Sequence, residues 1–326
     1  MAERLPVAVV TGALGSGKTT LLRSLLTHPG MGETAVLVNE LGEVGIDHHL
    51  LRQVDERTVL LASGCLCCSM RGDLADELRD LLTRRDRGEI PPFGRVVVET
   101  TGLADPAPIL YTLLAEPVLR HHFELETVVV TVDAQHGLGR EEAVRQAAAA
   151  DTLVVTKVET VEQDAVAALE EELGRLNPLA SVREVSFGDV DPALLFPGPE
   201  RRRSPRDLTP PPASDGAREN KKHSHDGVEA FALTVEGELD WTAFGVWLTM
   251  LLQSRGADVL RVKGLLNVGA TGPVLLNGVQ HVVHPPEHLD AWPDGERRSR
   301  LVFIARGIGR AELEASLAAF QRAART

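Results

Sequence analysis

Residues 12–19, with the sequence GALGSGKT, restrict the possible fold of this chain more than any other segment. They follow an apolar, β-branched run at Pro6–Thr11 and open a helical pattern, TTLLRSLL. The segment therefore predicts a strand, a tight glycine-rich turn and a helix in immediate succession. In such a turn, glycines allow successive backbone N–H groups to point at one anion, and the helix N-terminus adds the positive end of its dipole. We expect a phosphate-binding loop.

The pattern G-x-x-x-x-G-K-[ST] gives separate tasks to the polar side chains of this loop. Lys18 is placed to reach the β- and γ-phosphates of a nucleoside triphosphate, and the Thr19 hydroxyl is placed to bind Mg²⁺. A chance glycine-rich turn is the alternative, but the strand before it and the helix after it favour nucleotide binding. The residues predicted to contact the nucleotide here are Gly12, Gly15, Ser16, Gly17, Lys18, Thr19 and Thr20.

Short apolar runs alternate with helical patterns through the first half of the chain. The runs are apolar at nearly every position, as expected for parallel strands covered on both faces. Strands that alternate with helices imply βαβ units, so we predict an α/β fold with a doubly wound, mostly parallel sheet. Asp105 and Pro106 are predicted to cap and begin a further helix. The predicted strands are Pro6–Thr11, Thr34–Val38, Arg95–Glu99, Thr127–Val132 and Thr152–Thr156.

The composition changes at Phe196, and the segment from there to about Gly227 is rich in proline and charge. Such a segment buries too little apolar surface to offset the entropy of ordering it, so we predict a flexible linker. We therefore predict a phosphate-binding domain at residues 1–195, a linker at 196–227 and a second, smaller α+β domain at 228–326.

Strand and helix patterns resume after the predicted linker. A helix is expected to begin near Asp240, and we expect its Trp241 and Trp247 to pack in the core of the smaller domain. The other predicted elements of this domain are strands at Val228–Glu236, Val259–Val268, Val274–Val283 and Arg300–Ala305 and a final helix from about Arg310.

Acidic residues follow two of the predicted strands of the first domain. The segment Asn39–Asp47, NELGEVGID, offers carboxylates for Mg²⁺ or for positioning water, although, taken alone, it is better explained as an ordinary acidic loop. Glu99 ends another strand, where a carboxylate that holds the Mg²⁺ shell or orients the attacking water belongs. We predict Lys18 and Glu99 as catalytic residues, and Gly102 as a hinge whose N–H contacts the γ-phosphate. An ordinary strand-end carboxylate is the alternative for Glu99.

The segment Thr156-Lys157-Val158-Glu159 follows the last of these strands. GTPases place Asn-Lys-x-Asp at this point, and its acid accepts hydrogen bonds from guanine N1 and N2. Here Thr replaces Asn and Glu replaces Asp, which keeps hydrogen-bonding groups but changes their reach by about a methylene. We predict that Thr156, Lys157 and Glu159 contact the base, while selection of guanine over adenine stays open.

All the cysteines of the chain lie in GCLCC, residues 64–68. Cys65, Cys67 and Cys68 are thiolate donors suited to Zn²⁺, and three protein ligands leave one exchangeable position. A redox pair and a set of inert thiols remain as alternatives. In the predicted linker, His223 and His225 are either an entry point for metal or solvated side chains.

Together these segments resemble the CobW-type GTPases, relatives of the nickel-handling HypB and UreG proteins. The resemblance rests on GALGSGKTT, NELGEVGID, GCLCC, ETTGLADP and TKVE, in this order, and extends over essentially the whole chain. It implies a P-loop GTPase domain that binds GTP, GDP and Mg²⁺, hydrolyses GTP slowly to GDP and phosphate, and delivers Zn²⁺, or cobalt or iron, to a client metalloprotein. It also implies Glu40 as an oxygen ligand for zinc.

Composition narrows the possible partners. The net charge of −13 and the aromatic content of 4% argue against nucleic acid, because a phosphate backbone would be repelled and few rings are available for stacking. The apolar run Val7–Val10 is too short for a signal peptide or a membrane span, so we expect a cytoplasmic protein. Its oligomeric state stays open between a monomer and a nucleotide-dependent homo-oligomer. The alternative functions are a nucleotide-gated zinc sensor or buffer, and a kinase of a small molecule.

Overall fold

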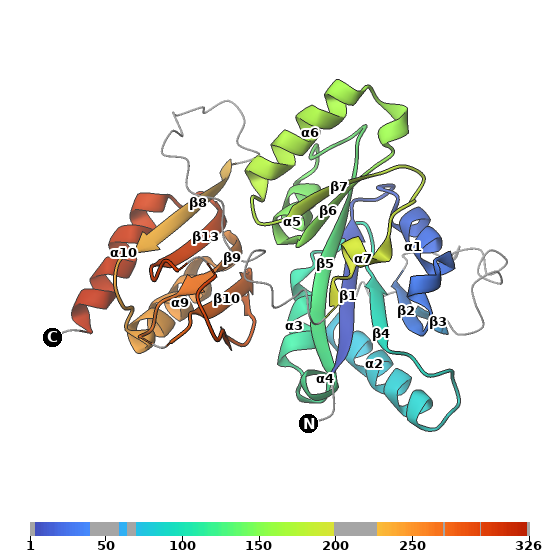
Figure 1. Cartoon of the computed structure of the whole chain (residues 1–326), viewed down its shortest axis with the longest axis horizontal. Helices are drawn as coiled ribbons and strands as arrows, with labels where there is room; N and C mark the ends of the chain where they lie inside the picture. Colours follow the sequence, from blue (N-terminus) through green and yellow to red (C-terminus); the bar gives the residue numbers. More distant parts are fainter. Residues whose placement is uncertain are drawn as a thin grey trace. The chain divides into compact units, whose positions relative to one another are not determined.

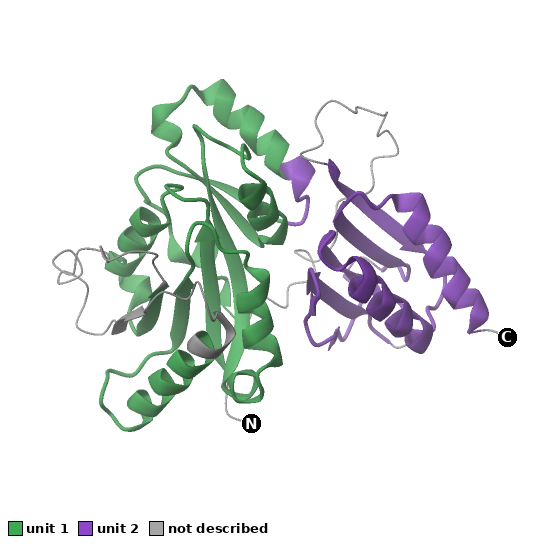
Figure 2. Ribbon diagram, turned by 180° about the vertical axis from the view of Figure 1, so that it is seen from behind, with its two compact units in different colours: residues 1–173, 180–202 green, residues 174–179, 203–326 purple. Residues whose placement is uncertain are grey.

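The structure, a computed structural model, describes residues 4–39, 59–63, 70–198, 227–269, 271–293 and 295–324 (Figure 1). The chain divides into two compact units, residues 1–173 with 180–202 and residues 174–179 with 203–326 (Figure 2). Each unit has a β-sheet and a hydrophobic core of its own. No helix in the described part of the chain is long and apolar enough to cross a membrane.

The first unit is built on a seven-stranded sheet with the order β3-β2-β4-β1-β5-β6-β7. Every neighbouring pair of strands is parallel, which confirms the predicted doubly wound α/β fold. The carboxyl ends of parallel strands meet at one edge of the sheet, so the loops that follow β1, β4, β5 and β6 converge there. The strands are β1 (Leu5–Gly12), β2 (Thr34–Asn39), β3 (Val59–Ser63), β4 (Arg95–Glu99), β5 (Phe123–Asp133), β6 (Thr152–Thr156) and β7 (Ser181–Val185).

Helices cover both faces of this sheet. Leucines of α1 pack on one face, against valines of β1, β2, β4, β5, β6 and β7, and α7 adds Leu195 to the same cluster. The helices α3 and α5 pack against β5 and lie on the other side of the sheet from α1 (Figure 1). The helices are α1 (Lys18–Thr27), α2 (Met70–Asp86), α3 (Ala107–Ala115), α4 (Pro117–His122), α5 (Glu141–Ala149), α6 (Gln163–Leu176) and α7 (Pro192–Leu195), with 3₁₀ turns η1 (Pro29–Met31) and η3 (Val158–Thr160).

The elements differ from the sequence predictions at a few points. The edge strands β3 and β7 are not predicted by the sequence pattern, and β5 begins at Phe123 instead of Thr127. The helix α3 begins at Ala107, one residue after the predicted start. Asp105 still caps it, because its Oδ1 accepts a hydrogen bond of 2.9 Å from the Ala107 N–H.

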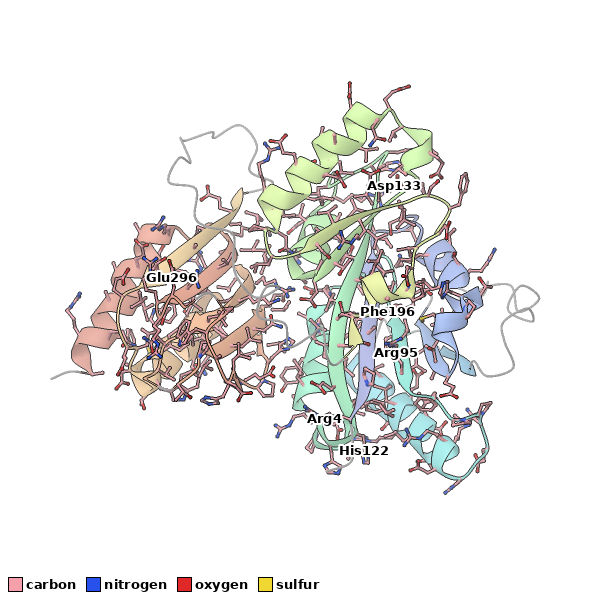
Figure 3. The ribbon with its side chains drawn as sticks, in the orientation of Figure 1. Arg4, Arg95, His122, Asp133, Phe196 and Glu296 are labelled. Atoms are coloured by element: carbon pink, nitrogen blue, oxygen red, sulfur yellow. The ribbon has the colours of Figure 1, made fainter. Side chains whose placement is uncertain are left out.

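Phe196 belongs to the core of the first unit, although composition places it at the start of the linker. It is 3% exposed and packs with α1 and the sheet. The guanidinium carbon of Arg95 lies 5.3 Å from the centroid of its ring, and Figure 3 shows the two side chains together. Arg95 Nε also donates to Glu126 Oε2 over 3.1 Å, so the aromatic ring lies against a paired cation.

The second unit contains an antiparallel sheet with the order β11-β10-β9-β13-β8, and β12 pairs with β10. Together with the helices α9 and α10, which contact each other, this sheet forms the predicted small α+β domain. Its elements are β8 (Val228–Val235), α9 (Trp241–Arg255), β9 (Val259–Leu266), β10 (Val274–Val279), β11 (Val282–Val283), β12 (Glu287–His288), β13 (Ser299–Arg306) and α10 (Arg310–Ala323).

The helix α9 shows how the core of the second unit is closed. Asp240 caps it, because the carboxylate accepts a hydrogen bond of 2.8 Å from the Ala243 N–H. Trp247 is 2% exposed and packs in the core, as predicted, and its Nε1 donates to Ser316 Oγ over 3.0 Å. The prediction for Trp241 is wrong, because this side chain, at the first residue of the helix, is 42% exposed. Its ring stacks on that of buried Phe244, with 6.2 Å between the centroids, so it covers the edge of the core from outside.

Candidate functional site

The glycine-rich loop joins β1 to α1 as the sequence predicts, and its backbone conformation explains its glycines. Gly12, Gly15 and Gly17 have φ values of 145°, 78° and 88°, in the region that side chains avoid. A Cβ on Gly12 would also lie 2.2 Å from Thr131 Oγ1. The Ser16 and Thr131 hydroxyls are hydrogen-bonded at 2.6 Å, so the neighbouring strand β5 holds the loop in place.

Lys18 is folded back over the first half of this loop. Its Nζ donates to the carbonyl oxygens of Gly12 over 2.8 Å and of Ala13 over 3.1 Å, and the residue is only 8% exposed. A buried ammonium beside the backbone of a helix N-terminus creates a strongly electropositive position. The loop is therefore built to receive an anionic group such as a phosphate.

Glu99 and Thr19 meet beside the loop, although they are far apart in the sequence. Glu99 ends β4 and is 1% exposed, and the Thr19 hydroxyl donates to its Oε1 over 3.3 Å. The next residue, Thr100, donates through Oγ1 to the Thr11 hydroxyl over 2.6 Å, which fixes the end of β4 to β1. Two oxygen donors at this position are the ligand type that Mg²⁺ prefers.

The loop after β4 lies directly on the phosphate loop. A Cβ on Gly102 would be 2.5 Å from the Leu14 nitrogen and 2.6 Å from its Cα, so only glycine allows this approach. The Gln146 amide of α5 donates to the carbonyl oxygens of Gly102 over 3.3 Å and of Ala104 over 3.0 Å. No local pattern in the sequence points to Gln146, since its partners lie more than forty residues away.

The predicted base-contacting segment follows β6. The Thr156 hydroxyl is buried and donates to the Ser16 carbonyl oxygen over 2.7 Å, so it supports the phosphate loop. Lys157 has a φ of 58°, and its Nζ donates to Asp133 Oδ2 over 2.6 Å. Glu159 is exposed, and its Oε2 accepts a hydrogen bond of 3.0 Å from Ser186 Oγ at the end of β7. Of the three predicted residues, Glu159 alone is exposed to solvent.

Asp133, at the end of β5, is a buried carboxylate that contacts Lys157, His136 and the Gln135 N–H. Burial raises the pKa of its carboxyl, but hydrogen bonds from Lys157, from the Gln135 N–H and from His136 outweigh burial and leave the pKa below its ordinary value. Asp133 belongs to none of the motifs recognised in the sequence. Its position at the carboxyl end of an apolar strand is the signal that points to it.

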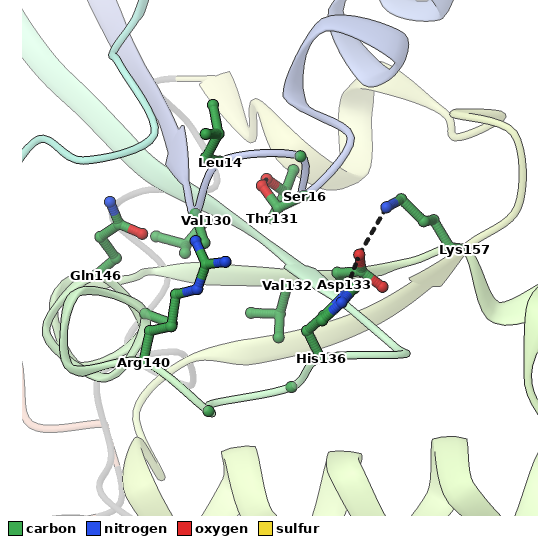
Figure 4. A pocket seen from close by; sticks show the side chains of 15 residues that line it. Leu14, Ser16, Val130, Thr131, Val132, Asp133, His136, Arg140, Gln146 and Lys157 are labelled. Atoms are coloured by element: carbon green, nitrogen blue, oxygen red, sulfur yellow. Dashed lines mark hydrogen bonds and ion pairs between the residues drawn. The ribbon is translucent and has the colours of Figure 1, made fainter.

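A pocket of about 190 Å³ opens between the phosphate loop, the end of β5 and α5 (Figure 4). Its polar side chains come from opposite walls, and the dashed line in Figure 4 marks the contact between Lys157 and Asp133. The side chains that line it include Leu14, Ser16, Asp133, Arg140, Gln146 and Lys157. Because residues of α5 and of the phosphate loop line the same pocket, α5 lies beside the predicted phosphate site.

The predicted zinc ligands lie outside the described residues. This applies to Cys65, Cys67, Cys68 and Glu40, and also to His223 and His225 of the predicted linker. Among the residues that the structure describes, no group of three or more His, Cys, Asp or Glu side chains is arranged to hold a metal ion. Of the predicted metal ligands, only Thr19 is described, beside Glu99.

The fold and the loop define a P-loop nucleotide-binding domain of the doubly wound class. The CobW/HypB/UreG nucleotide-binding domain family matches residues 6–184, and the cobalamin synthesis protein cobW C-terminal domain matches residues 228–321. The chain belongs to the CobW/HypB/UreG family of P-loop GTPases, as the resemblance of its motifs implies.

Individual relatives resemble the chain over nearly its full length. The zinc chaperone YjiA of Escherichia coli is 31% identical over 98% of this chain and 99% of its own. The zinc chaperone CobW of Pseudomonas aeruginosa is 29% identical over 95% of this chain and 90% of its own. The crystal structure of Zn(II)-bound YjiA GTPase from E. coli superposes with a TM-score of 0.74 at 28% identity, over 98% of this chain and 99% of that one. The two-domain fold is therefore shared with a GTPase that binds zinc.

Proposed function

We propose that this chain hydrolyses GTP to GDP and phosphate and couples its nucleotide state to the loading and delivery of Zn²⁺. The observation that carries the proposal is the meeting of Lys18, Thr19 and Glu99 around one phosphate loop. The relatives that match nearly the whole chain are named zinc chaperones, which supports zinc as the cargo.

The described residues suggest how the hydrolysis proceeds. Lys18, once released from the Gly12 and Ala13 carbonyls, would neutralise charge on the β- and γ-phosphates. Thr19 and Glu99 offer oxygens that suit Mg²⁺, which supplies further charge neutralisation when bound. Glu99 also orients the attacking water. Catalysis then rests on positioning and charge stabilisation, without a covalent intermediate.

The cargo site is proposed from the sequence. Cys65, Cys67 and Cys68 supply thiolates for Zn²⁺, with Glu40 as an oxygen ligand. Their segments lie between β2 and the start of α2 in the sequence, and both β2 and β4 belong to the sheet that carries the phosphate loop. We propose that the γ-phosphate changes the ligand set through these neighbouring segments, and that a client metalloprotein receives the zinc in the cytoplasm.

The proposal is tested by chelator competition for Zn²⁺ on the whole protein, loaded with Mg²⁺ and either a non-hydrolysable GTP analogue or GDP. We expect zinc affinities that differ by at least about tenfold, a coupling of roughly 1.4 kcal/mol. A Cys67→Ser variant should lose the zinc but keep its GTP affinity. Equal zinc affinities in the two nucleotide states would contradict the coupling, and absence of GTP turnover would favour a zinc sensor or buffer.

A further inference from the structure

Gln146 is a buried amide that joins two parts of the site. It lies in α5, is 1% exposed, and reaches the loop after β4 through its Nε2. Its two acceptors are the carbonyl oxygens of Gly102, at 3.3 Å, and of Ala104, at 3.0 Å. One side chain therefore holds two backbone groups of a loop that comes from the opposite side of β1 in the sheet order.

Packing alone does not account for an amide at this position. The residues around it in α5, Ala143, Val144 and Ala147, are all buried and apolar. A buried amide is unfavourable unless its polar atoms are hydrogen-bonded, and the Gln146 Oε1 has no hydrogen-bond partner among the described residues. An apolar side chain would avoid this cost, so the two hydrogen bonds of Nε2 are the specific contribution of glutamine here.

These hydrogen bonds hold the loop against the phosphate loop. Gly102 approaches Leu14 so closely that a Cβ would lie 2.5 Å from the Leu14 nitrogen. Lys18 Nζ, the group that binds the terminal phosphates, rests at the neighbouring Gly12 and Ala13 carbonyls. Gly102 is thus kept beside the place where a third phosphate would lie, and a diphosphate has no group there.

We propose that Gln146 is a positioning residue that gives the site its preference for a nucleoside triphosphate over a diphosphate. It does so by holding the Gly102 peptide where a terminal phosphoryl group can meet it. This inference rests on the proposed function, since it concerns the discrimination between GTP and GDP by the same site. It assigns Gln146 no contact with the nucleotide, and it places the effect in binding, before any hydrolysis.

The test compares Gln146→Met with Gln163→Met in the full chain, by titration with a non-hydrolysable GTP analogue and with GDP. Methionine keeps the length of the side chain and removes the donor, and Gln163 is an exposed glutamine at the start of α6. We expect Gln146→Met to lose about tenfold in affinity for the analogue and to stay within about twofold for GDP. We expect Gln163→Met to match the unmodified protein for both.

Equal losses for the analogue and GDP, or no loss, would overturn the inference while leaving GTP binding intact. If the unmodified protein binds neither nucleotide, the proposed function fails and the inference fails with it. A second measurement avoids dependence on the variant. In the unmodified protein, the analogue, and not GDP, should slow amide hydrogen exchange at residues 102–104, and identical exchange with both nucleotides would overturn the inference.

Discussion

At the scale of single residues, the site depends on a cation and a carboxylate that are both held by short polar contacts. Lys18 rests on two carbonyl oxygens of its own loop, and Asp133 accepts hydrogen bonds from Lys157 and His136. Both side chains are at least nine-tenths buried. Replacing either one removes a charge that its surroundings are arranged to hold. We expect the loss of Lys18 to change nucleotide affinity and the loss of Asp133 to change the pH dependence of stability.

Lys18→Ala should weaken binding of the GTP analogue by roughly 10- to 100-fold, because a hydrogen bond to a charged group contributes about 1.5–3 kcal/mol. Isothermal titration at constant salt measures the change, and circular dichroism checks the fold. Arg23→Ala is the matched control, since Arg23 is an exposed cation of the same helix, and its loss should leave affinity unchanged. Retention of tight binding in Lys18→Ala would contradict the role given to this residue.

Asp133→Asn should change how stability depends on pH. Burial raises the pKa of this carboxyl, but the hydrogen bonds from Lys157 and its neighbours lower it further, so the folded-state pKa lies below the unfolded one. The resulting stabilisation is fully present above the ordinary aspartate pKa of about 3.9 and is lost as pH falls through the folded-state pKa. In urea unfolding, we expect the variant to lose about 1–3 kcal/mol at neutral pH and to flatten the profile below about pH 4. A profile parallel to that of the unmodified protein would show that the contact contributes nothing.

At the scale of elements, β4 delivers both Glu99 and the loop that holds Gly102. The strand lies between β1 and β2, and glycines stand on both sides of it. Gly94, just before the strand, has open space where a Cβ would lie, whereas Gly102 is in contact with the Leu14 backbone. Substituting alanine at each of these two glycines therefore distinguishes the effect of a steric clash on stability from the effect of a less flexible backbone.

Gly102→Ala should destabilise the first unit by about 1–3 kcal/mol, because the new methyl group forces two backbone segments apart. Gly94→Ala should be neutral, or stabilising by up to about 1 kcal/mol through a less flexible unfolded chain. Urea denaturation of both variants measures the difference. Equal stabilities would mean that the loop after β4 moves away from Leu14 at no cost.

At the scale of the whole molecule, each unit has its own buried cluster of apolar side chains. The three tryptophans, Trp241, Trp247 and Trp292, all belong to the second unit. Tryptophan fluorescence therefore follows the unfolding of that unit, whereas circular dichroism follows helices of both.

Phe196→Ala should destabilise the first unit by about 3–5 kcal/mol, as expected for truncation of a buried aromatic side chain. Circular dichroism should then show an earlier unfolding phase, while the transition seen by tryptophan fluorescence stays in place. Phe187→Ala is the control, because Phe187 is 76% exposed. Equal shifts in both signals would show that the two units unfold as one.

Local patterns in the sequence predict a large part of this fold. The strands Arg95–Glu99 and Thr152–Thr156 have the predicted limits, because continuous apolar runs mark strands buried on both faces. The edge strand β7, SVREV, is mostly exposed or half-buried and lacks such a run, so its pattern gives no comparable signal. The positions of Lys18 and Thr19 at the start of α1 also follow from the loop motif alone.

The amino-acid sequence by itself determined the phosphate loop, the family and the two-domain plan, because each depends on residues that are neighbours in the chain or fixed in spacing. Only the tertiary structure decided which distant side chains support the loop. The contacts Ser16–Thr131, Gln146–Gly102 and Lys157–Asp133 join residues 115, 44 and 24 positions apart. Strand order and helix packing bring these partners together, because they place the loops after β1, β4, β5 and β6 at one edge of the sheet. A local sequence pattern contains no information on which distant residues become neighbours in this way.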